Sequence, residues 1–126
     1  TGRMTSDERL STAVDIYFRA LHGCDGDLLD AVFHPTASLF DVDDGYVRVD
    51  PYPIWRQEVV SRPSPAAAGQ QRDDNVVAVH WLSASCATVH VRLRILDQIF
   101  VDHLSFVLDD GRFRIVAKTW HLERTT

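Results

Sequence analysis

Apolar and polar residues alternate most regularly near the end of the chain, over residues 98–122. Four apolar side chains fall on one face of a predicted strand at 98–108, because strand side chains alternate with a period of two: Phe100, Leu104, Phe106 and Leu108. Asp109–Gly111 predicts a turn, and residues 112–122 predict the returning strand. The rest of the predicted sheet is arranged around this hairpin.

Asp102 falls on the same face as this apolar stripe. A carboxylate inside a buried apolar stripe costs free energy unless it is paired with a cation, hydrogen-bonded or protonated. Asp102 is therefore either a neutral acid in an apolar pocket or the partner of Lys118, the only lysine in the chain. According to the length of the turn, the expected register places Asp102 opposite Lys118 or opposite Thr119.

Two further segments, residues 75–83 and 85–95, show the same alternation. A two-residue turn at 96–97 would join the second segment to the strand that carries Asp102. The register that follows pairs Val91 with Asp102, and the pairs on either side of it are Val89 with Leu104 and Leu93 with Phe100.

The beginning of the chain carries the spacing of a helix. Thr5 followed by Glu8 is typical of a capping box, and the apolar residues after it recur on one helical face: Leu10, Val14, Tyr17, Phe18 and Leu21. Tyr17 therefore points inward, with a hydroxyl group that needs a hydrogen-bond partner. That partner is either a backbone carbonyl of the core or an oxygen of a bound ligand.

A short second helix ends at His34, because the residue before a proline avoids helical backbone angles. His34 is read either as a helix-end side chain or as a catalytic base. Two small strands follow, at residues 37–42 and 46–49. A third helix begins at Asp50 and ends before Pro63.

This order of elements predicts an α+β fold, in which three N-terminal helices pack over the concave face of a strongly curved antiparallel sheet. We expect one domain over residues 1–126. Residues 1–3 precede Met4 and are read as a cloning remnant.

Composition narrows the classes of partner. The chain is 45% hydrophobic and 25% charged, as in soluble globular proteins, and its net charge of −5 argues against nucleic acid. It has no apolar run of membrane-spanning length and no signal-peptide pattern, so we expect no membrane contact and a cytoplasmic location. His90 and His103, expected as cross-strand neighbours facing away from the pocket, are too few for a zinc site. We expect neither a metal nor a cofactor.

Three motifs resemble those of the nuclear transport factor 2-like superfamily, which has a cystatin-like fold. They are Phe33-His34-Pro35, the pattern Phe100-x-Asp102-x-Leu104, and the segment from Gly111 to Trp120. Within the superfamily, the pattern is most similar to the putative lumazine-binding domain family. The resemblance implies a cone-shaped sheet with a pocket inside it, and a homodimer formed through the convex sheet face.

More distantly, the chain resembles ketosteroid isomerases, in which two hydrogen-bond donors hold a substrate oxygen and a carboxylate moves a proton. This resemblance implies that Tyr17 and Asp102 form the oxyanion hole. It also implies that Asp41 is the base and that Trp120 matches a tryptophan of the last strand. Asp41 is followed by Val42, whereas proline follows the base in those isomerases.

Two functions from different classes follow. The first is an acid–base enzyme, an isomerase or cyclase, in which Tyr17 and Asp102 polarise the oxygen of an apolar carbonyl compound. Asp41 or His34 would then move the proton. The second is a non-catalytic binding or dimeric interaction domain that holds a small apolar or aromatic molecule. The residues expected to contact the ligand are Trp55, Phe100, Leu104, Lys118 and Trp120.

Overall fold

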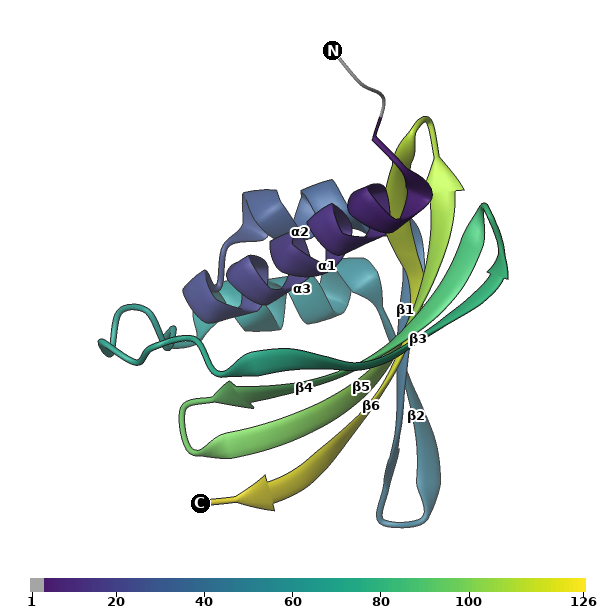
Figure 1. Ribbon diagram of the computed structural model, residues 1–126. Helices are drawn as coiled ribbons and strands as arrows, with labels where there is room; N and C mark the ends of the chain where they lie inside the picture. Colours follow the sequence, from purple (N-terminus) through teal and green to yellow (C-terminus); the bar gives the residue numbers. More distant parts are fainter. Residues whose placement is uncertain (1–3) are drawn as a thin grey trace.

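The computed structural model describes residues 4–126 of the chain. Its three helices are α1 (Ser6–Gly23), α2 (Gly26–Val32) and α3 (Tyr52–Ser61). They lie together on the concave side of a curved six-stranded sheet (Figure 1). The predicted α+β class is therefore confirmed, whereas the interpretation of residues 1–3 as a cloning remnant lies outside the described residues.

The sheet positions the central hairpin between two outer pairs of strands. The strands are β1 (Phe33–Asp43), β2 (Tyr46–Pro51), β3 (Asp74–Ser83), β4 (Cys86–Ile95), β5 (Gln98–Asp109) and β6 (Arg112–Thr125). Their order is β2-β1-β6-β5-β4-β3, and neighbours are antiparallel except that β1 runs parallel to β6. The strands β5 and β6 therefore lie at the centre of the sheet.

The helix α1 begins with the predicted capping box. The Thr5 hydroxyl accepts a hydrogen bond from the Glu8 N–H at 3.1 Å, and Glu8 Oε1 accepts one from the Thr5 N–H at 3.2 Å. The predicted apolar face is buried, and Tyr17 on it has no exposed surface. Within residues 4–126, none of the helices combines the length and apolar character needed to cross a membrane.

The chain around His34 differs from the prediction. The helix α2 ends one residue before β1 starts at Phe33, so His34 is the second residue of a strand rather than the end of a helix. Pro35 keeps the residue before it extended, and Phe33 pairs with Ile115 of β6 instead of closing another helical turn. The ring Nδ1 of His34 lies 2.7 Å from the hydroxyl oxygen of Thr36.

The predicted register between β4 and β5 is confirmed. Leu96 and Asp97 form the connecting turn, with Leu96 in the left-handed region at a φ of 56°. Val91 pairs with Asp102, and the two flanking pairs are also those expected from the sequence.

The predicted register between β5 and β6 is wrong. Asp102 pairs with Trp120, not with Lys118 or Thr119. The two-residue turn Asp110–Gly111, whose φ angles are 50° and 81°, has the positive φ values typical of tight hairpins. That turn alone would have placed Asp102 opposite Thr119, so a further shift occurs within the hairpin.

A β-bulge at Val116 causes this shift. Ile115 and Ala117 pair with successive residues of β5, so Val116 is an extra residue on β6. Side chains alternate between the two faces of a strand, and the extra residue therefore changes the alternation from this point on. Ile115 faces the concave side, and after the bulge Lys118 and Trp120 do so as well.

The hydrophobic core lies between the helices and the concave face of the sheet. Its completely buried side chains include Leu29, Leu39, Val59, Val89, Leu104 and Ile115. Among residues 4–126, two charged residues are buried with them: Asp102 is 2% exposed and Lys118 is 6% exposed.

Candidate functional site

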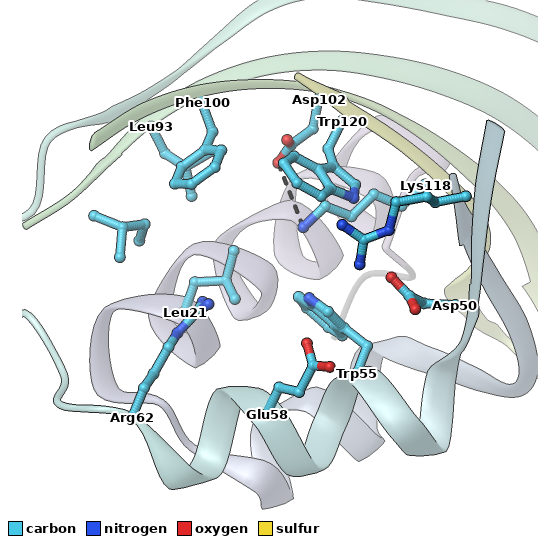
Figure 2. A pocket seen from close by; sticks show the side chains of 12 residues that line it. Leu21, Asp50, Trp55, Glu58, Arg62, Leu93, Phe100, Asp102, Lys118 and Trp120 are labelled. Carbon is cyan, nitrogen blue, oxygen red and sulfur yellow. Dashed lines mark ion pairs between the residues drawn. The ribbon is translucent and has the colours of Figure 1, made fainter. Parts of the chain in front are cut away.

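Asp102 and Lys118 line a cavity of about 190 Å³ between α3 and the concave face of the sheet (Figure 2). The apolar part of its wall consists of Leu21, Trp55, Leu93, Ile95, Phe100 and Trp120. The charged part consists of Arg48, Asp50, Glu58, Arg62, Asp102 and Lys118. The cavity therefore offers aromatic surface and both signs of charge to a small molecule.

Tyr17 of α1 contacts the buried carboxylate from the helix layer. Its hydroxyl donates a hydrogen bond to Asp102 Oδ2 at 2.5 Å, and both side chains are buried. Burial raises the pKa of the Tyr17 phenol well above its usual value, and the negative charge and hydrogen bond of Asp102 raise it further. Tyr17 therefore stays protonated, and its partner is Asp102 rather than a backbone carbonyl.

Lys118 of β6 approaches the same carboxylate oxygen. Its Nζ lies 3.8 Å from Asp102 Oδ2, 4.5 Å from the centroid of the Trp55 ring and 5.2 Å from that of Tyr17. Burial lowers the pKa of the Lys118 ammonium group, and the charge of Asp102 only partly offsets that effect. Because Asp102 accepts from Tyr17 and faces a cation, the geometry favours the ion pair over a neutral acid.

Two buried polar atoms of the cavity wall lack a hydrogen-bond partner among residues 4–126. They are Asp102 Oδ1 and Trp120 Nε1, on side chains that pair across β5 and β6. A buried acceptor or donor without a hydrogen bond costs roughly 1–3 kcal/mol, so native proteins seldom leave one unless a ligand or water completes it. These two atoms are the strongest indication that the cavity receives another molecule.

The helix α3 and the residue that follows it line the opposite wall with two charged side chains that the sequence did not predict. Glu58 follows Trp55 by three residues and shares its helical face, and Arg62 is the first residue after the helix. Figure 2 shows both across the cavity from Phe100 and Asp102. For Glu58, the spacing from Trp55, itself expected to face inward, is the signal that identifies it.

Four of the predicted site residues do not line this cavity. Tyr17 is completely buried and contacts the cavity wall through its hydrogen bond to Asp102. Leu104 is completely buried opposite Lys118 and belongs to the core. Asp41 lies on β1 and lines a separate pocket together with Trp120. His34, also on β1, contacts Thr36. Neither predicted base therefore reaches the cavity that Asp102 lines.

Histidines gather on the other face of the sheet. His90 and His103 meet there as expected, with ring centroids 4.7 Å apart. No group of three His, Cys, Asp or Glu side chains in the described part of the chain is arranged to hold a metal ion. The two imidazoles alone are fewer protein ligands than zinc sites use.

Solved structures with the same fold cover nearly the whole chain. An NTF-2 like protein of unknown function from Silicibacter pomeroyi is 22% identical, with a TM-score of 0.82 over 95% of this chain and 100% of its own. An NTF2-like protein of unknown function from Shewanella baltica is 16% identical, with a TM-score of 0.81 over 98% and 100%. A ketosteroid isomerase-like protein from Erwinia carotovora atroseptica is 10% identical, with a TM-score of 0.65 over 92% and 95%.

At these identities the structural neighbours show the fold and leave the function open. No curated protein matches the chain. The protein family described as "Putative lumazine-binding" matches residues 5–121, which include all the motifs noted in the sequence. The chain therefore belongs to this family, and it has the fold of the NTF2-like proteins.

Proposed function

We propose that the protein binds a small, flat molecule with a carbonyl or carboxylate oxygen in the cavity between α3 and the sheet. The observation that carries this proposal is the pair of unpartnered buried atoms, Asp102 Oδ1 and Trp120 Nε1, in the wall that also contains Lys118. The description of the family agrees with a small-molecule ligand.

The three polar groups define what a ligand must present. A ligand oxygen would accept a hydrogen bond from the Trp120 indole N–H and interact with the Lys118 ammonium group. A neighbouring hydroxyl or N–H of the same ligand would donate to Asp102 Oδ1. Hydrogen bonds to charged groups are shorter and stronger than neutral ones. The site therefore favours a ligand with an acceptor oxygen next to a donor.

The walls and the volume favour an aromatic ligand of limited size. Phe100 and Trp120 meet edge to face with centroids 5.8 Å apart, and Trp55 lines the cavity with them. Aromatic side chains pack well against a planar ring. The volume of about 190 Å³ is below the roughly 300–1,000 Å³ typical of sites for drug-sized ligands. A ligand of one or two rings fits this space.

Tryptophan fluorescence tests the proposal, because two of the three tryptophans line the cavity. We expect benzoate and acetophenone to change the tryptophan emission up to a saturating value. Toluene has no oxygen, so it should bind at least about tenfold more weakly. Trp120→Phe keeps an aromatic ring but removes the N–H, so benzoate affinity should fall about 10- to 100-fold.

Trp81→Phe is the matched control, because Trp81 packs against Phe113 and does not line the cavity. Its benzoate affinity should equal that of the wild-type protein. Equal binding of toluene and benzoate, or unchanged benzoate affinity in Trp120→Phe, would contradict the proposed ligand chemistry.

A second candidate function is acid–base isomerisation or cyclisation of an apolar carbonyl compound. Glu58 favours it, because this carboxylate lines the same cavity as Asp102 and Lys118 and could act as the base in place of Asp41 or His34. Lys118 would polarise the carbonyl oxygen, and Tyr17 would hold Asp102 in position through its hydrogen bond.

Conversion of a β,γ-unsaturated cyclohexenone to its conjugated isomer, followed by absorbance, tests this second function. Glu58→Gln should lower the rate by about 10²-fold or more if Glu58 is the base. A loss in Asp41→Asn instead would support the base implied by the resemblance to ketosteroid isomerases. Absence of turnover in the wild-type protein would leave binding as the function.

We further propose that two copies of the chain pair through the convex sheet face. The three helices lie on the concave side and leave the convex face uncovered (Figure 1). Its central side chains carry no fixed charge: Val101, His103, Ser105, Ala117 and Thr119. A twofold interface repeats each residue, so His103→Glu would bring like charges together. We expect a dimer by sedimentation velocity and monomers for this variant; a monomeric wild-type protein would contradict the proposal.

A further inference from the structure

Lys118 is the only lysine in the chain, and it lies in the cavity wall rather than on the surface. Only 6% of the residue is exposed, although lysine is among the side chains least often buried. Its nearest anionic oxygen, Asp102 Oδ2 at 3.8 Å, is farther away than a hydrogen bond reaches. The Lys118 amine is therefore only loosely held and lies where a bound ligand would be.

We propose that Lys118 forms an imine with the carbonyl carbon of an aldehyde or ketone bound in the cavity. The proposal rests on the binding function proposed above and adds a covalent step at the same site. Lys118 and Trp120 are neighbours on one face of β6. A carbonyl oxygen that accepts from the Trp120 N–H would therefore present its carbon to Lys118 Nζ.

The amine must lose its proton before it can attack a carbonyl. Burial lowers the pKa of Lys118; the charge of Asp102 works in the opposite direction, and Arg62 across the cavity adds to the lowering. Arg48 and Glu58 also line the cavity, with opposite charges. An unprotonated fraction of Lys118 is therefore present at lower pH than for an exposed lysine.

The step is balanced without any further reactant. Lys118 Nζ, once deprotonated, forms a C–N bond, and the carbonyl π electrons move to the oxygen, which takes a proton and gives a carbinolamine. The nitrogen lone pair then forms the C=N bond while the protonated hydroxyl group leaves as water. The net change is amine plus carbonyl to imine plus water. Asp102 Oδ1, the unpartnered oxygen, can take the proton from nitrogen and return it to the leaving hydroxyl.

The cavity also suits the cationic form of the product. The Trp55 ring lies 4.5 Å from Nζ and the Tyr17 ring 5.2 Å from it. Aromatic faces stabilise cations at such distances, and a protonated imine carries its charge at the position that the ammonium group occupies. The charge balance with Asp102 is therefore preserved through the reaction.

Reductive trapping with benzaldehyde and sodium cyanoborohydride near neutral pH tests the proposal. The hydride reduces a protonated imine to a stable amine, so peptide mass mapping should find a benzyl group on Lys118. Arg124→Lys provides a matched control, because it introduces a lysine at an exposed position of the same strand. We expect Lys118 to be labelled at least about tenfold faster than the introduced lysine, because burial lowers the pKa of Lys118 and leaves more of its amine unprotonated near neutral pH. Labelling of Lys118 no faster than that of the exposed lysine would overturn the proposal.

Benzoate, which cannot form an imine, separates this proposal from the binding function. Lys118→Arg removes the nucleophilic amine, so trapping at position 118 should be lost. If the wild-type protein binds benzoate but Lys118 is not trapped, the imine step is wrong and the binding function stands. If neither is observed, both are wrong. Trapping without benzoate binding supports the imine step and contradicts a carboxylate ligand.

Discussion

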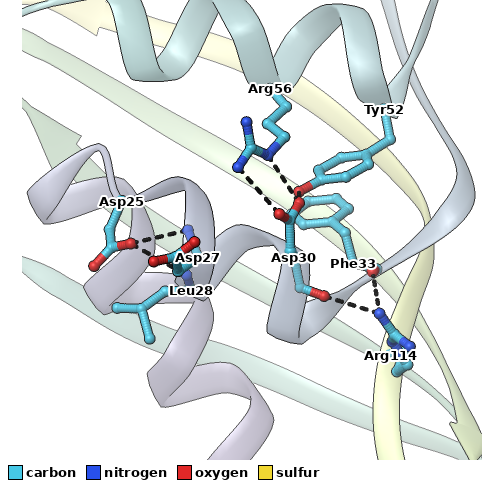
Figure 3. A network of polar contacts seen from close by, with 8 residues as sticks. All are labelled: Asp25, Asp27, Leu28, Asp30, Phe33, Tyr52, Arg56 and Arg114. Atoms are coloured by element: carbon cyan, nitrogen blue, oxygen red, sulfur yellow. Dashed lines mark hydrogen bonds and ion pairs between the residues drawn. The ribbon is translucent and has the colours of Figure 1, made fainter.

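Two clusters in this protein each join a tyrosine, an aspartate and a cation, one at the surface between α2 and α3 and one in the cavity. At the surface, Asp30 Oδ1 accepts from the Tyr52 hydroxyl at 2.6 Å and from Arg56 Nε at 2.8 Å, and Asp30 Oδ2 accepts from Arg56 Nη2 at 3.0 Å (Figure 3). In the cavity, Asp102 Oδ2 accepts from Tyr17, whereas Asp102 Oδ1 has no partner among residues 4–126 and the lysine lies 3.8 Å away.

The two clusters differ in what they do: the surface cluster stabilises packing, whereas the cavity cluster has room for the proposed ligand. Burial alone would raise the pKa of Asp30, but hydrogen bonds from Arg56 and Tyr52 outweigh it and hold that pKa below its usual value. Both oxygens of Asp30 are used, and the two-point contact of an arginine is the strong form of such a pair. The cavity cluster keeps a carboxylate oxygen and an ammonium group available, at the cost of burying them.

Removal of the aspartate should therefore cost far more in the cavity than at the surface. Asp102→Asn leaves the Lys118 ammonium group buried without its counter-ion, and we expect the free energy of unfolding to fall by about 3–5 kcal/mol. The double variant Asp102→Asn with Lys118→Met should recover much of that loss, because it removes both charges. Urea unfolding of the two proteins measures the difference. A small loss in the single variant would instead support a neutral Asp102.

Tyr17→Phe should have the next largest effect, about 1.5–3 kcal/mol, because it removes a hydrogen bond to a charged group. It should also change the dependence of stability on pH. In the unfolded chain a tyrosine ionises near pH 10, whereas burial keeps native Tyr17 protonated to higher pH. Above about pH 10 the native state thus binds more protons than the unfolded state, and stability falls as pH rises.

This fall should be shallower in Tyr17→Phe than in the wild-type protein, when unfolding is measured between about pH 9 and pH 11. Tyr52→Phe should make the fall shallower too, because burial and the Asp30 hydrogen bond raise the pKa of Tyr52 as well. An identical slope in the wild-type protein and in Tyr17→Phe would mean that Tyr17 ionises as readily in the native state as in the unfolded chain.

Asp30→Asn should have the smallest effect, about 1 kcal/mol or less, because Arg56 and Asp30 are partly exposed and water screens their attraction. Benzoate binding should be unchanged, since neither residue lines the cavity. Urea unfolding and the fluorescence titration measure both quantities. A loss as large as that in Asp102→Asn would remove the contrast between the two clusters.

Local rules were enough to predict the elements that follow from turns and alternation. The β4–β5 register depends only on a two-residue turn, and it brings Val91 opposite Asp102 as expected. The β5–β6 register depends on the bulge as well. Val116 is β-branched and suits a regular strand, so its residue type does not reveal that it is extra.

A pattern in β6 does carry a signal for the bulge. The large inward side chains change from odd positions, Phe113 and Ile115, to even positions, Trp120 and Leu122. A strand with strict alternation cannot place all four on one face. An odd-to-even change within a predicted strand therefore indicates a bulge between the two sets.

Cavity-lining positions of the candidate site could be predicted where side chains belong to the central hairpin or to the inward face of a helix. Phe100 and Trp55 line the cavity for these reasons. Glu58 was missed because a charged residue on a helix is most often exposed to solvent. The role of Asp41 rested on resemblance, and that of His34 on its place before Pro35. The positions of both depend on how β1 pairs with β6, a contact between segments far apart in the sequence.

Because of the bulge at Val116, the number of residues in β6 decides, as much as their identity, which side chains face the cavity. Deletion of Val116 would remove the residue without a partner and leave Asp102 opposite Trp120. Deletion of Thr119, three positions later, would turn the Trp120 indole to the convex face and take its N–H out of the cavity. Benzoate binding would distinguish the two deletions. When relatives are aligned, the placement of a single gap in β6 therefore decides whether a tryptophan is counted inside or outside the pocket.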